Sequence, residues 1–555
     1  MTPTLGLCGY PGCSNIRNYS NGTCVVCHRV LCNGHNISEY HACKALSERD
    51  FGIADTAAFR GEQYAALVQV ATANMPAVAL ALRPGAKSCS MPLPSIAQLP
   101  VDDDPGRTYE SIQWIFNGIM NLHTMATFDD GVKWLARIRA TDAYSICPER
   151  EMRRRVLRSE VITTRLLHQI DPKLIPNAYG PPTVFMQEAP LPDYLFVDFM
   201  EGEVIDGENR YDPAYCEQPL RDLAALFVKL ACKPFEGIGS LQAKSAEGEP
   251  AVGPLFSVWA TTYPSTYPHG PFRTNAERYL TEIDHKLLLV EAGLDGTHHP
   301  VAEMLWYLEA RALVEGDSEM ATVGPTFLHH GDEKHDILLA KDGRLSGVID
   351  WEMAYTAPFA EAFCGDFVVH ADFWKGSNKL LSSQLVLIDE FRRLGRHDLA
   401  QAVIGGPKYH RIKYALWGLG QTLGHEDVVN VWALRSAFLG EEGAGPMPRS
   451  VAEWMDDAKR RFADHEGLQR VIAMHPVEEE MACHVQEIDS PSPQAATDEA
   501  GYVVDNEDHD KIGIVDEKIA QLDLFSSSLN DHNRSAGGVE VTARSDSDIT
   551  AHMAA

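Results

Sequence analysis

Alternating apolar and polar positions predict a β-hairpin in the first third of the chain. In residues 132–139 every second residue is apolar, so these side chains share one face of a strand. The members of this face are Val132, Trp134, Ala136 and Ile138. The opposite face carries Lys133, Leu135, Arg137 and Arg139. Residues 124–128 and the turn at 129–131 complete the hairpin.

Helical periodicity dominates the rest of the chain. Residues 149–170 repeat at helical spacing, and Glu160 falls on the inward stripe with Val156 and Leu167. A buried carboxylate needs a cationic partner. One apolar strand is predicted at 195–200. Further helices are predicted at 220–232, 276–292, 301–314, 382–393, 398–403, 408–423 and 452–465.

The stretch 327–354 places acids around a second hairpin. Short strands at 337–340 and 345–349 flank Asp342-Gly343, a dipeptide typical of two-residue hairpin turns. The acids are Asp332, Asp336 and Asp350. Converging carboxylates repel one another unless a cation lies between them, and Mg²⁺ is bound by one or two carboxylates together with substrate phosphates. Phosphoryl transfer needs such acids, one as a base and others on the metal.

The motifs His330-Gly331-Asp332, Ile337-Leu338 and Ile349-Asp350-Trp351-Glu352 resemble those of the aminoglycoside phosphotransferase and choline kinase-like family. The resemblance covers roughly residues 109–462 and implies an α+β, protein-kinase-like fold with a β-rich small lobe and a helical large lobe. It implies that Asp332 is the catalytic base and that Asp350 binds the metal. Asp336 stands where the family has Asn, in a loop that is one residue shorter, and Asp can also coordinate Mg²⁺.

The same resemblance implies a nucleotide site in the small lobe. Arg137, in a W-x-A-R-I pattern, would hold the α- and β-phosphates and pair with Glu160, with Lys133 as the rival cation. The turn at 116–121 would cover the phosphates, through Gly118 and Asn121. The hinge after the strand at 195–200 would meet adenine through backbone groups of Asp198, Phe199 and Met200.

Composition narrows the classes of partner. The chain has 555 residues, 45% of them hydrophobic, which is enough for two to four domains with sizeable cores. Its formal net charge of −30 argues against nucleic-acid and membrane binding. The sequence contains no long apolar run and no signal-peptide pattern at its start. We expect a cytoplasmic protein, with a nuclear location also open, that acts on a small-molecule acceptor.

The first 43 residues hold eight possible metal ligands in closely spaced pairs. The gaps between successive ligands are four, ten, two, four, two, five and one residues, which is similar to the AN-one-type zinc finger. That resemblance implies two tetrahedral Zn²⁺ sites in a cross-brace. One would use Cys8, Cys13, Cys32 and His35. The other would use Cys24, Cys27, His41 and Cys43. The alternatives are a reduced, cysteine-rich loop without metal or, in an oxidising compartment, a disulfide framework.

We therefore expect four regions. They are a zinc-finger-like module at 1–46, a linker with a possible helix at 47–107, a kinase-like domain at 108–470 and an acidic, disordered tail at 471–555. The predicted function is ATP- and Mg²⁺-dependent transfer of phosphate to a small-molecule hydroxyl. The alternative is a catalytically impaired kinase-like scaffold whose zinc module and tail bind protein partners.

Overall fold

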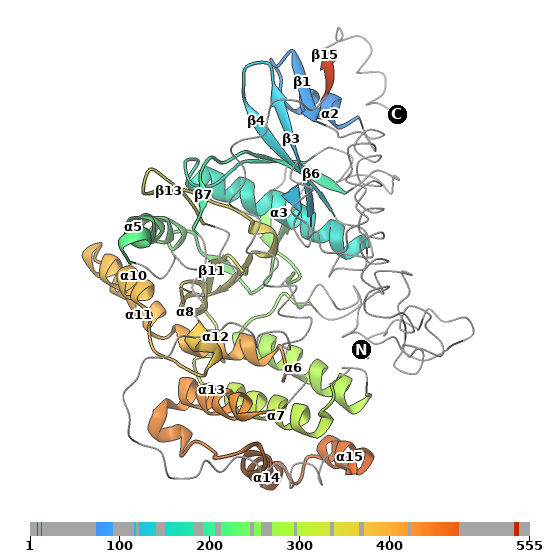
Figure 1. The fold of residues 1–555 in the computed structure, drawn as a ribbon, viewed down its shortest axis with the longest axis vertical. Coiled ribbons are helices and arrows are strands. Elements are labelled where there is room, and N and C mark those ends of the chain that lie inside the picture. Colours follow the sequence, from blue (N-terminus) through green and yellow to red (C-terminus); the bar gives the residue numbers. More distant parts are fainter. Residues whose placement is uncertain are drawn as a thin grey trace, which may run out of the picture.

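The computed structural model has an α+β architecture of two lobes, as predicted. In Figure 1 a twisted sheet with one long helix, α3, lies above a larger lobe made mostly of helices. The described residues are Cys8, Cys13, Leu31 and the ranges 74–92, 116–117, 121–139, 150–180, 193–205, 213–244, 249–256, 269–293, 297–332, 338–365, 371–419, 423–476 and 538–542.

A seven-stranded antiparallel sheet forms the small lobe. Its strand order is β15-β1-β3-β4-β6-β5, with β2 beside β3. The hairpin predicted from the apolar alternation is confirmed as β3 and β4, and Trp134, Ala136 and Ile138 of its buried face pack in one apolar cluster. The strands are β1 (Ser88–Pro92), β2 (Phe116–Asn117), β3 (Asn121–Phe128), β4 (Lys133–Arg139), β5 (Ala178–Tyr179), β6 (Tyr194–Asp198) and β15 (Gly538–Thr542).

Helix α3 (Arg150–Ile170) is attached to both lobes. Leu157 and Val161 pack against the sheet, whereas Ile162 and Leu167 belong to the core of the large lobe. Just beyond the helix, the carbonyl oxygen of Leu174 accepts a hydrogen bond of 2.8 Å from the backbone N–H of Val348. Helix α3, which carries Glu160, is therefore packed against both lobes.

Small sheets connect the lobes and support the predicted acidic loops. Three-stranded sheets have the orders β14-β11-β8 and β13-β12-β7, and β9 pairs with β10. Their strands are β7 (Glu203–Val204), β8 (Phe235–Glu236), β9 (Leu241–Ala243), β10 (Pro250–Val252), β11 (Pro325–His329), β12 (Leu338–Lys341), β13 (Arg344–Val348) and β14 (Tyr355–Pro358). The short 3-10 helix η7 (Trp351–Met353) lies between β13 and β14.

The helices of the large lobe enclose two apolar cores. One core joins α5, α10 and α11 to the strands β11 to β14, and the other lies among α6, α7 and α12 to α15. The helices are α5 (Pro213–Leu230), α6 (Asn275–Glu291), α7 (Pro300–Gly316), α8 (Phe359–Ala362), α9 (Ala371–Trp374), α10 (Ser382–Arg393), α11 (His397–Ile404), α12 (Gly406–Ala415), α13 (His425–Ala444), α14 (Val451–Arg461) and α15 (Glu466–Met474). Among the described residues no helix is long and apolar enough to cross a membrane.

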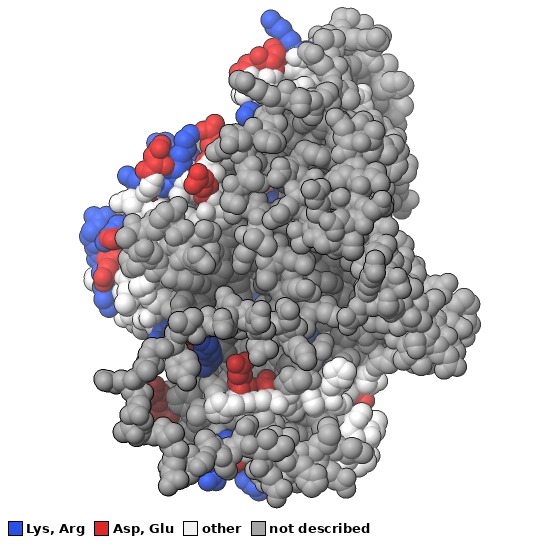
Figure 2. All heavy atoms as spheres, in the orientation of Figure 1, with Lys and Arg blue, Asp and Glu red and all other residues white. Residues whose placement is uncertain are grey.

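Charges on one edge of the molecule are paired. Figure 2 shows basic and acidic side chains interspersed over the edge where α5, α10 and the hairpin β12–β13 lie. Arg221 binds Glu217 and Glu390, and Arg344 binds Asp222. This edge therefore offers no surface of a single charge to a nucleic acid or a membrane.

Two elements lie in the described part of the predicted linker with a possible helix, 47–107. Helix α2 (Met75–Leu82) and strand β1 lie inside it, and Met75 and Met91 are buried in the same apolar cluster as Trp134. These two elements therefore belong to the small lobe. At the other end, α15 runs past the expected boundary, and β15 adds a strand from the predicted tail to β1.

The predicted zinc module falls almost entirely outside the described residues. Cys8 is buried against Leu31, and Cys13 packs beside them, which brings the first ligand pair next to the residue that precedes Cys32 in the sequence. The remaining predicted ligands lie outside the described residues. They are Cys24, Cys27, Cys32, His35, His41 and Cys43.

Candidate active site

The hairpin β12–β13 delivers Asp350 to the junction of the lobes. Its turn is confirmed, because Asp342 and Gly343 both have positive φ angles, of 53° and 72°. Asp350 follows the second strand and is itself left-handed, with φ of 65°. Such a conformation is uncommon for a residue other than glycine and turns the chain sharply into Trp351. The Asp350 side chain retains 32% exposure, so a cation can reach it.

The His330-Gly331-Asp332 loop lies against the loop that carries Asp350. Strands β11 and β14 pair antiparallel, so the ends of these loops are neighbours. His330 Nε2 donates to the carbonyl oxygen of Ile349 at 2.8 Å. Gly331 has φ of 77°, and a Cβ atom there would lie 2.2 Å from the carbonyl oxygen of Met353. Glycine is required at this close approach, which sets the position of Asp332 immediately after it.

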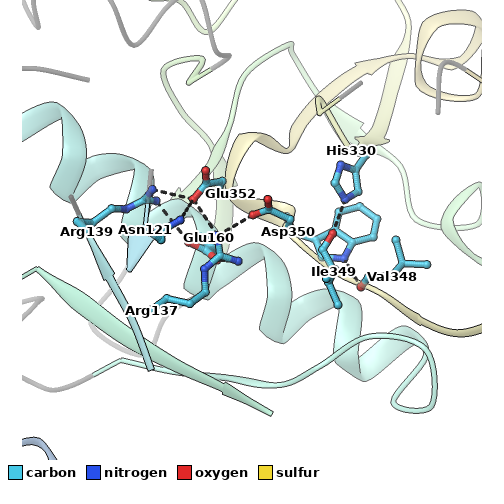
Figure 3. A network of polar contacts seen from close by, with 10 residues as sticks. Asn121, Arg137, Arg139, Glu160, His330, Val348, Ile349, Asp350 and Glu352 are labelled. Atoms are coloured by element: carbon cyan, nitrogen blue, oxygen red, sulfur yellow. Dashed lines mark hydrogen bonds and ion pairs between the residues drawn. The ribbon is translucent and has the colours of Figure 1, made fainter. Parts of the chain in front are cut away.

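Two buried arginines and two buried glutamates form a closed ring of alternating charge. Figure 3 shows Arg137 and Arg139 reaching from β4 toward Glu160 of α3 and Glu352 of η7. Arg137 is 3.0 Å from each glutamate, through Nη1 to Glu160 and Nη2 to Glu352. Arg139 closes the ring at 3.4 Å from Glu160 and 2.7 Å from Glu352. Asn121 adds a hydrogen bond of 2.8 Å to Glu352.

Asp350 binds this ring from outside. Its Oδ1 atom lies 2.6 Å from Nη2 of Arg137, on the side away from Arg139 (Figure 3). Two guanidinium groups face three carboxylates, which leaves one negative charge in excess. Glu160 and Glu352 are 2% and 5% exposed at the side chain, so the accessible excess is on Asp350.

Burial shapes the titration of the ring. Desolvation would lower the pKa of Arg137, but Glu160, Asp350 and Glu352 raise it, so the guanidinium stays charged. Desolvation raises the pKa of Glu160 to about 7, against the opposing charges of Arg137 and Arg139. Burial therefore favours the protonated form of Glu160, and the charges of the two arginines favour its anion.

Comparison with known proteins finds one family model that matches part of the chain. Residues 135–377 match the model of the phosphotransferase enzyme family. The match covers less than half of the chain, and over these residues the chain is similar to that family. Among curated proteins, none matches the chain.

Several solved structures are similar to the chain at low identity. Aminoglycoside phosphotransferase APH(2'')-Ib with ADP bound has 11% identity and a TM-score of 0.35, and the match covers 58% of this chain and 93% of that one. A thermostable mutant of APH(4)-Ia in complex with AMP-PNP and hygromycin B has 13% identity and a TM-score of 0.33, with 61% and 97% covered. Macrolide 2'-phosphotransferase MphH from Brachybacterium faecium has 14% identity and a TM-score of 0.29, with 58% and 89% covered.

Arg137 contacts both Glu160 and Asp350, two other residues of the predicted site. The expected pair of Arg137 and Glu160 is present. The rival cation Lys133 lies outside the ring, exposed, with Nζ 5.9 Å from the Phe199 ring centroid. Asp332 is 8% exposed on the neighbouring loop.

Two predicted residues, Gly118 and Asp336, lie outside the described part of the domain. Asn121 is described, but its amide faces Glu352, inside the ion ring. Its predicted contact with the nucleotide therefore stays a prediction, and the turn that it ends is seen only where β2 pairs with β3.

Strand β6 ends at the predicted adenine hinge. The backbone N–H of Asp198 donates to the carbonyl oxygen of Asn177 at 3.0 Å, and that of Phe199 donates to Lys133 at 3.1 Å. The Asp198 carboxylate accepts from the Tyr179 hydroxyl and the Asn177 N–H, both at 3.0 Å. Of the three expected hinge residues, two thus use their N–H groups within the sheet. Met200 lies beyond it, packed over Gly347 of β13.

The residues present fit magnesium by their donor chemistry. Asp350 supplies hard carboxylate oxygens at an accessible position. Among the described residues no group of three or more His, Cys, Asp or Glu side chains could hold a metal ion. A site made of one or two carboxylates plus nucleotide phosphates is the usual form for Mg²⁺.

A buried network that sequence reasoning missed supports the Asp332 loop. Lys413 Nζ lies 2.8 Å from Nε2 of His329, and Nδ1 of the same ring lies 3.3 Å from the carbonyl oxygen of Ala362. Glu361, fully buried, lies 4.0 Å from the same lysine. The only sequence signal was the position of His329 beside the His330-Gly331-Asp332 motif.

Proposed function

We propose that this protein transfers the terminal phosphoryl group of ATP to a hydroxyl of a small molecule, with Mg²⁺ as cofactor. The observation that carries this proposal is the accessible Asp350, which is joined to a buried arginine beside the Asp332 loop. In this pair Arg137 would bind the phosphates of the nucleotide and Asp350 would bind their metal ion. The nearby carboxylate of Asp332 would act on the hydroxyl of the acceptor. Loss of the phosphoryl group converts ATP to ADP.

Each residue has a distinct part in this reaction. Met200 would offer its backbone N–H to adenine, because Asp198 and Phe199 already use theirs. Arg137 would hold phosphate oxygens through its planar fork of N–H groups. Asp350, with Asp336, would bind Mg²⁺, which neutralises charge on the phosphates. Asp332 would accept the proton of the attacking hydroxyl.

A second candidate function is a kinase-like scaffold that does not turn over. The observation that favours it is in the sequence, where Asp336 replaces the family's Asn in a shortened loop. Such a protein would still have a folded nucleotide site, and the zinc module and tail would bind protein partners. The two functions differ in ADP release rather than in nucleotide binding.

A pair of substitutions tests the phosphotransferase. In a metabolite screen that measures ADP release, Asp332→Asn should lower turnover by about a hundredfold or more, since positioned acid–base groups contribute 10² to 10⁴ in rate. It should leave Mg-ATP binding nearly intact. Asp350→Ala should instead remove Mg²⁺-dependent nucleotide binding. Asp389→Asn, at a side chain 71% exposed on α10, is the control. Near-normal turnover in Asp332→Asn would show that the base is assigned wrongly.

We also propose that residues 1–46 form an independent zinc module with two Zn²⁺ ions. The support is the spacing of the eight ligands and the packing of Cys8 and Cys13 against Leu31. So short a segment has little apolar material to bury, so metal binding would supply most of its folding free energy. Its role beside the phosphotransferase domain would be to bind a protein partner.

A further inference from the structure

The ion ring has a fixed part and an exchangeable part. Within the ring the side-chain exposures of Arg137, Arg139, Glu160 and Glu352 run from 2% to 8%. Each member contacts two others of opposite charge. If one member moved away, it would leave buried charges without a partner, which is unfavourable in the protein interior. Asp350 has only Arg137 as a partner among these four and is partly exposed.

Arg137 has one N–H that could change partner. Its Nη2 atom donates both to Asp350 and to Glu352. When Asp350 turns to a metal ion, that donor becomes open to a phosphate oxygen, while Glu160 still pairs with Nη1 and Glu352 with Nη2. The direction in which Arg137 points is then decided by the two glutamates.

Arg139 fixes those two glutamates. It lies two residues from Arg137 on the same face of β4, and it binds the second oxygen of Glu160 and the shared oxygen of Glu352. Without Arg139 each glutamate would have one guanidinium instead of two, and the ring would open. Asn121 supplies a neutral donor to Glu352 that cannot replace the lost charge.

We infer that Arg139 and Glu352 are positioning residues for the binding of nucleotide phosphates. They close the ring and thereby hold Arg137 in the direction of the phosphates when Asp350 leaves it to bind the metal. This inference rests on the proposed function. It assigns Glu352 a place in the ring rather than on the metal. Neither residue touches the nucleotide, and both act through Arg137.

Calorimetric titration of the full chain with Mg-ATP and, separately, with adenosine tests the inference. Adenosine lacks the phosphates that Arg137 would hold. Arg139→Lys and Glu352→Gln should each weaken Mg-ATP binding about tenfold or more, as loss of an outer-shell partner usually does. Adenosine binding and the Mg²⁺ concentration for half-maximal binding should not change. Arg344→Lys and Glu217→Gln, which alter an exposed pair each, are matched controls.

Thermal melting shows whether each variant folds. If Glu352→Gln does not fold, Arg139→Lys decides alone, because lysine keeps the charge but cannot bridge two carboxylates in a planar fork. Unchanged Mg-ATP affinity in a folded variant overturns the inference. Equal losses for Mg-ATP and adenosine also overturn it, because they indicate general loosening. A raised Mg²⁺ requirement in Glu352→Gln alone would make Glu352 a metal ligand and overturn it too.

The failure of the proposed function would be seen separately. If the unmodified chain binds neither Mg-ATP nor adenosine, the nucleotide site is wrong and the inference falls with it. Tight Mg-ATP binding that neither variant weakens overturns the inference alone and leaves the proposed function in place.

Discussion

Glu361 is the buried anion whose removal should destabilise the large lobe most directly. Its side chain is fully buried, and Oε1 accepts from Arg278 at 2.8 Å, from the Tyr355 hydroxyl at 2.8 Å and from the Tyr279 hydroxyl at 3.1 Å. Lys413 is 4.0 Å away. Substitution Glu361→Gln preserves the shape and one oxygen acceptor but removes the charge that the two cations face.

Two estimates of the cost agree. Desolvation alone would raise the pKa of Glu361, but Arg278, Lys413 and His329 lower it from 4.5 to about 2. A shift of that size corresponds to about 3 kcal/mol of favourable interaction. Breaking a buried ion pair by removing one partner costs about 3–5 kcal/mol in other proteins. We therefore expect Glu361→Gln to lower the free energy of unfolding by about 3 kcal/mol.

Urea denaturation at neutral pH measures this cost. At about 2–4 °C per kcal/mol, the melting temperature should also fall by about 6–12 °C. The stabilisation by Glu361 is present above its ordinary pKa and is lost as pH falls toward about 2, because its pKa is lowered in the folded state. The difference between the unmodified and Gln proteins should therefore narrow as pH falls below about 4.5.

Glu441→Gln, at an exposed position on α13, is the matched control and should change stability by less than about 0.5 kcal/mol. If Glu361→Gln behaved like this control, the network would not stabilise the lobe, and the reasoning from burial and pairing would be refuted. A difference that stayed constant down to low pH would refute the charge argument alone.

Two further predictions concern the Asp332 loop and the zinc module. Gly331→Ala should destabilise by more than about 1 kcal/mol and abolish ADP release, because it adds a Cβ against Met353 at positive φ. Gly343 has a similar φ but open space around it, so Gly343→Ala should lose only the stability that a positive φ costs an alanine. Equal destabilisation by the two substitutions would contradict the steric argument. Elemental analysis of residues 1–46 should find two zinc ions, with fewer in Cys24→Ser, and a strong chelator should expose this segment to protease without moving the melting transition of the lobes. Absence of zinc would refute the module.

Patterns among residues close in the sequence were enough to predict most of the helices and strands and the hairpin within residues 327–354. Strand alternation predicted β3–β4, and helical spacing predicted α3, α6, α7 and α10 to within one or two residues. The turn at Asp342-Gly343 has the backbone that the dipeptide indicates. These features depend on neighbours in the sequence, and the hydrophobic pattern states which face is buried.

Elements at the edge of the small lobe were missed because their partners are distant. Residues 87–105 contain several prolines and three consecutive aspartates, and composition there indicates a linker. Strand β1 nevertheless pairs with Phe128 and Thr127 of β3. A strand of five residues has too few positions for alternation to be decisive, and pairing with a strand elsewhere in the chain stabilises it.

The ring shows what sequence reasoning could and could not reach at the site. Period-two alternation placed Arg137 and Arg139 on one face, and helical spacing turned Glu160 inward, but the choice of a single cation for Glu160 was incomplete. Glu352 lies more than 200 residues along the chain from both arginines, and only the folding of η7 against β4 joins them. Charge balance then explains why a single arginine does not suffice. Two buried glutamates need two buried cations, and the third carboxylate, on Asp350, is the more exposed one, where we propose that the metal binds.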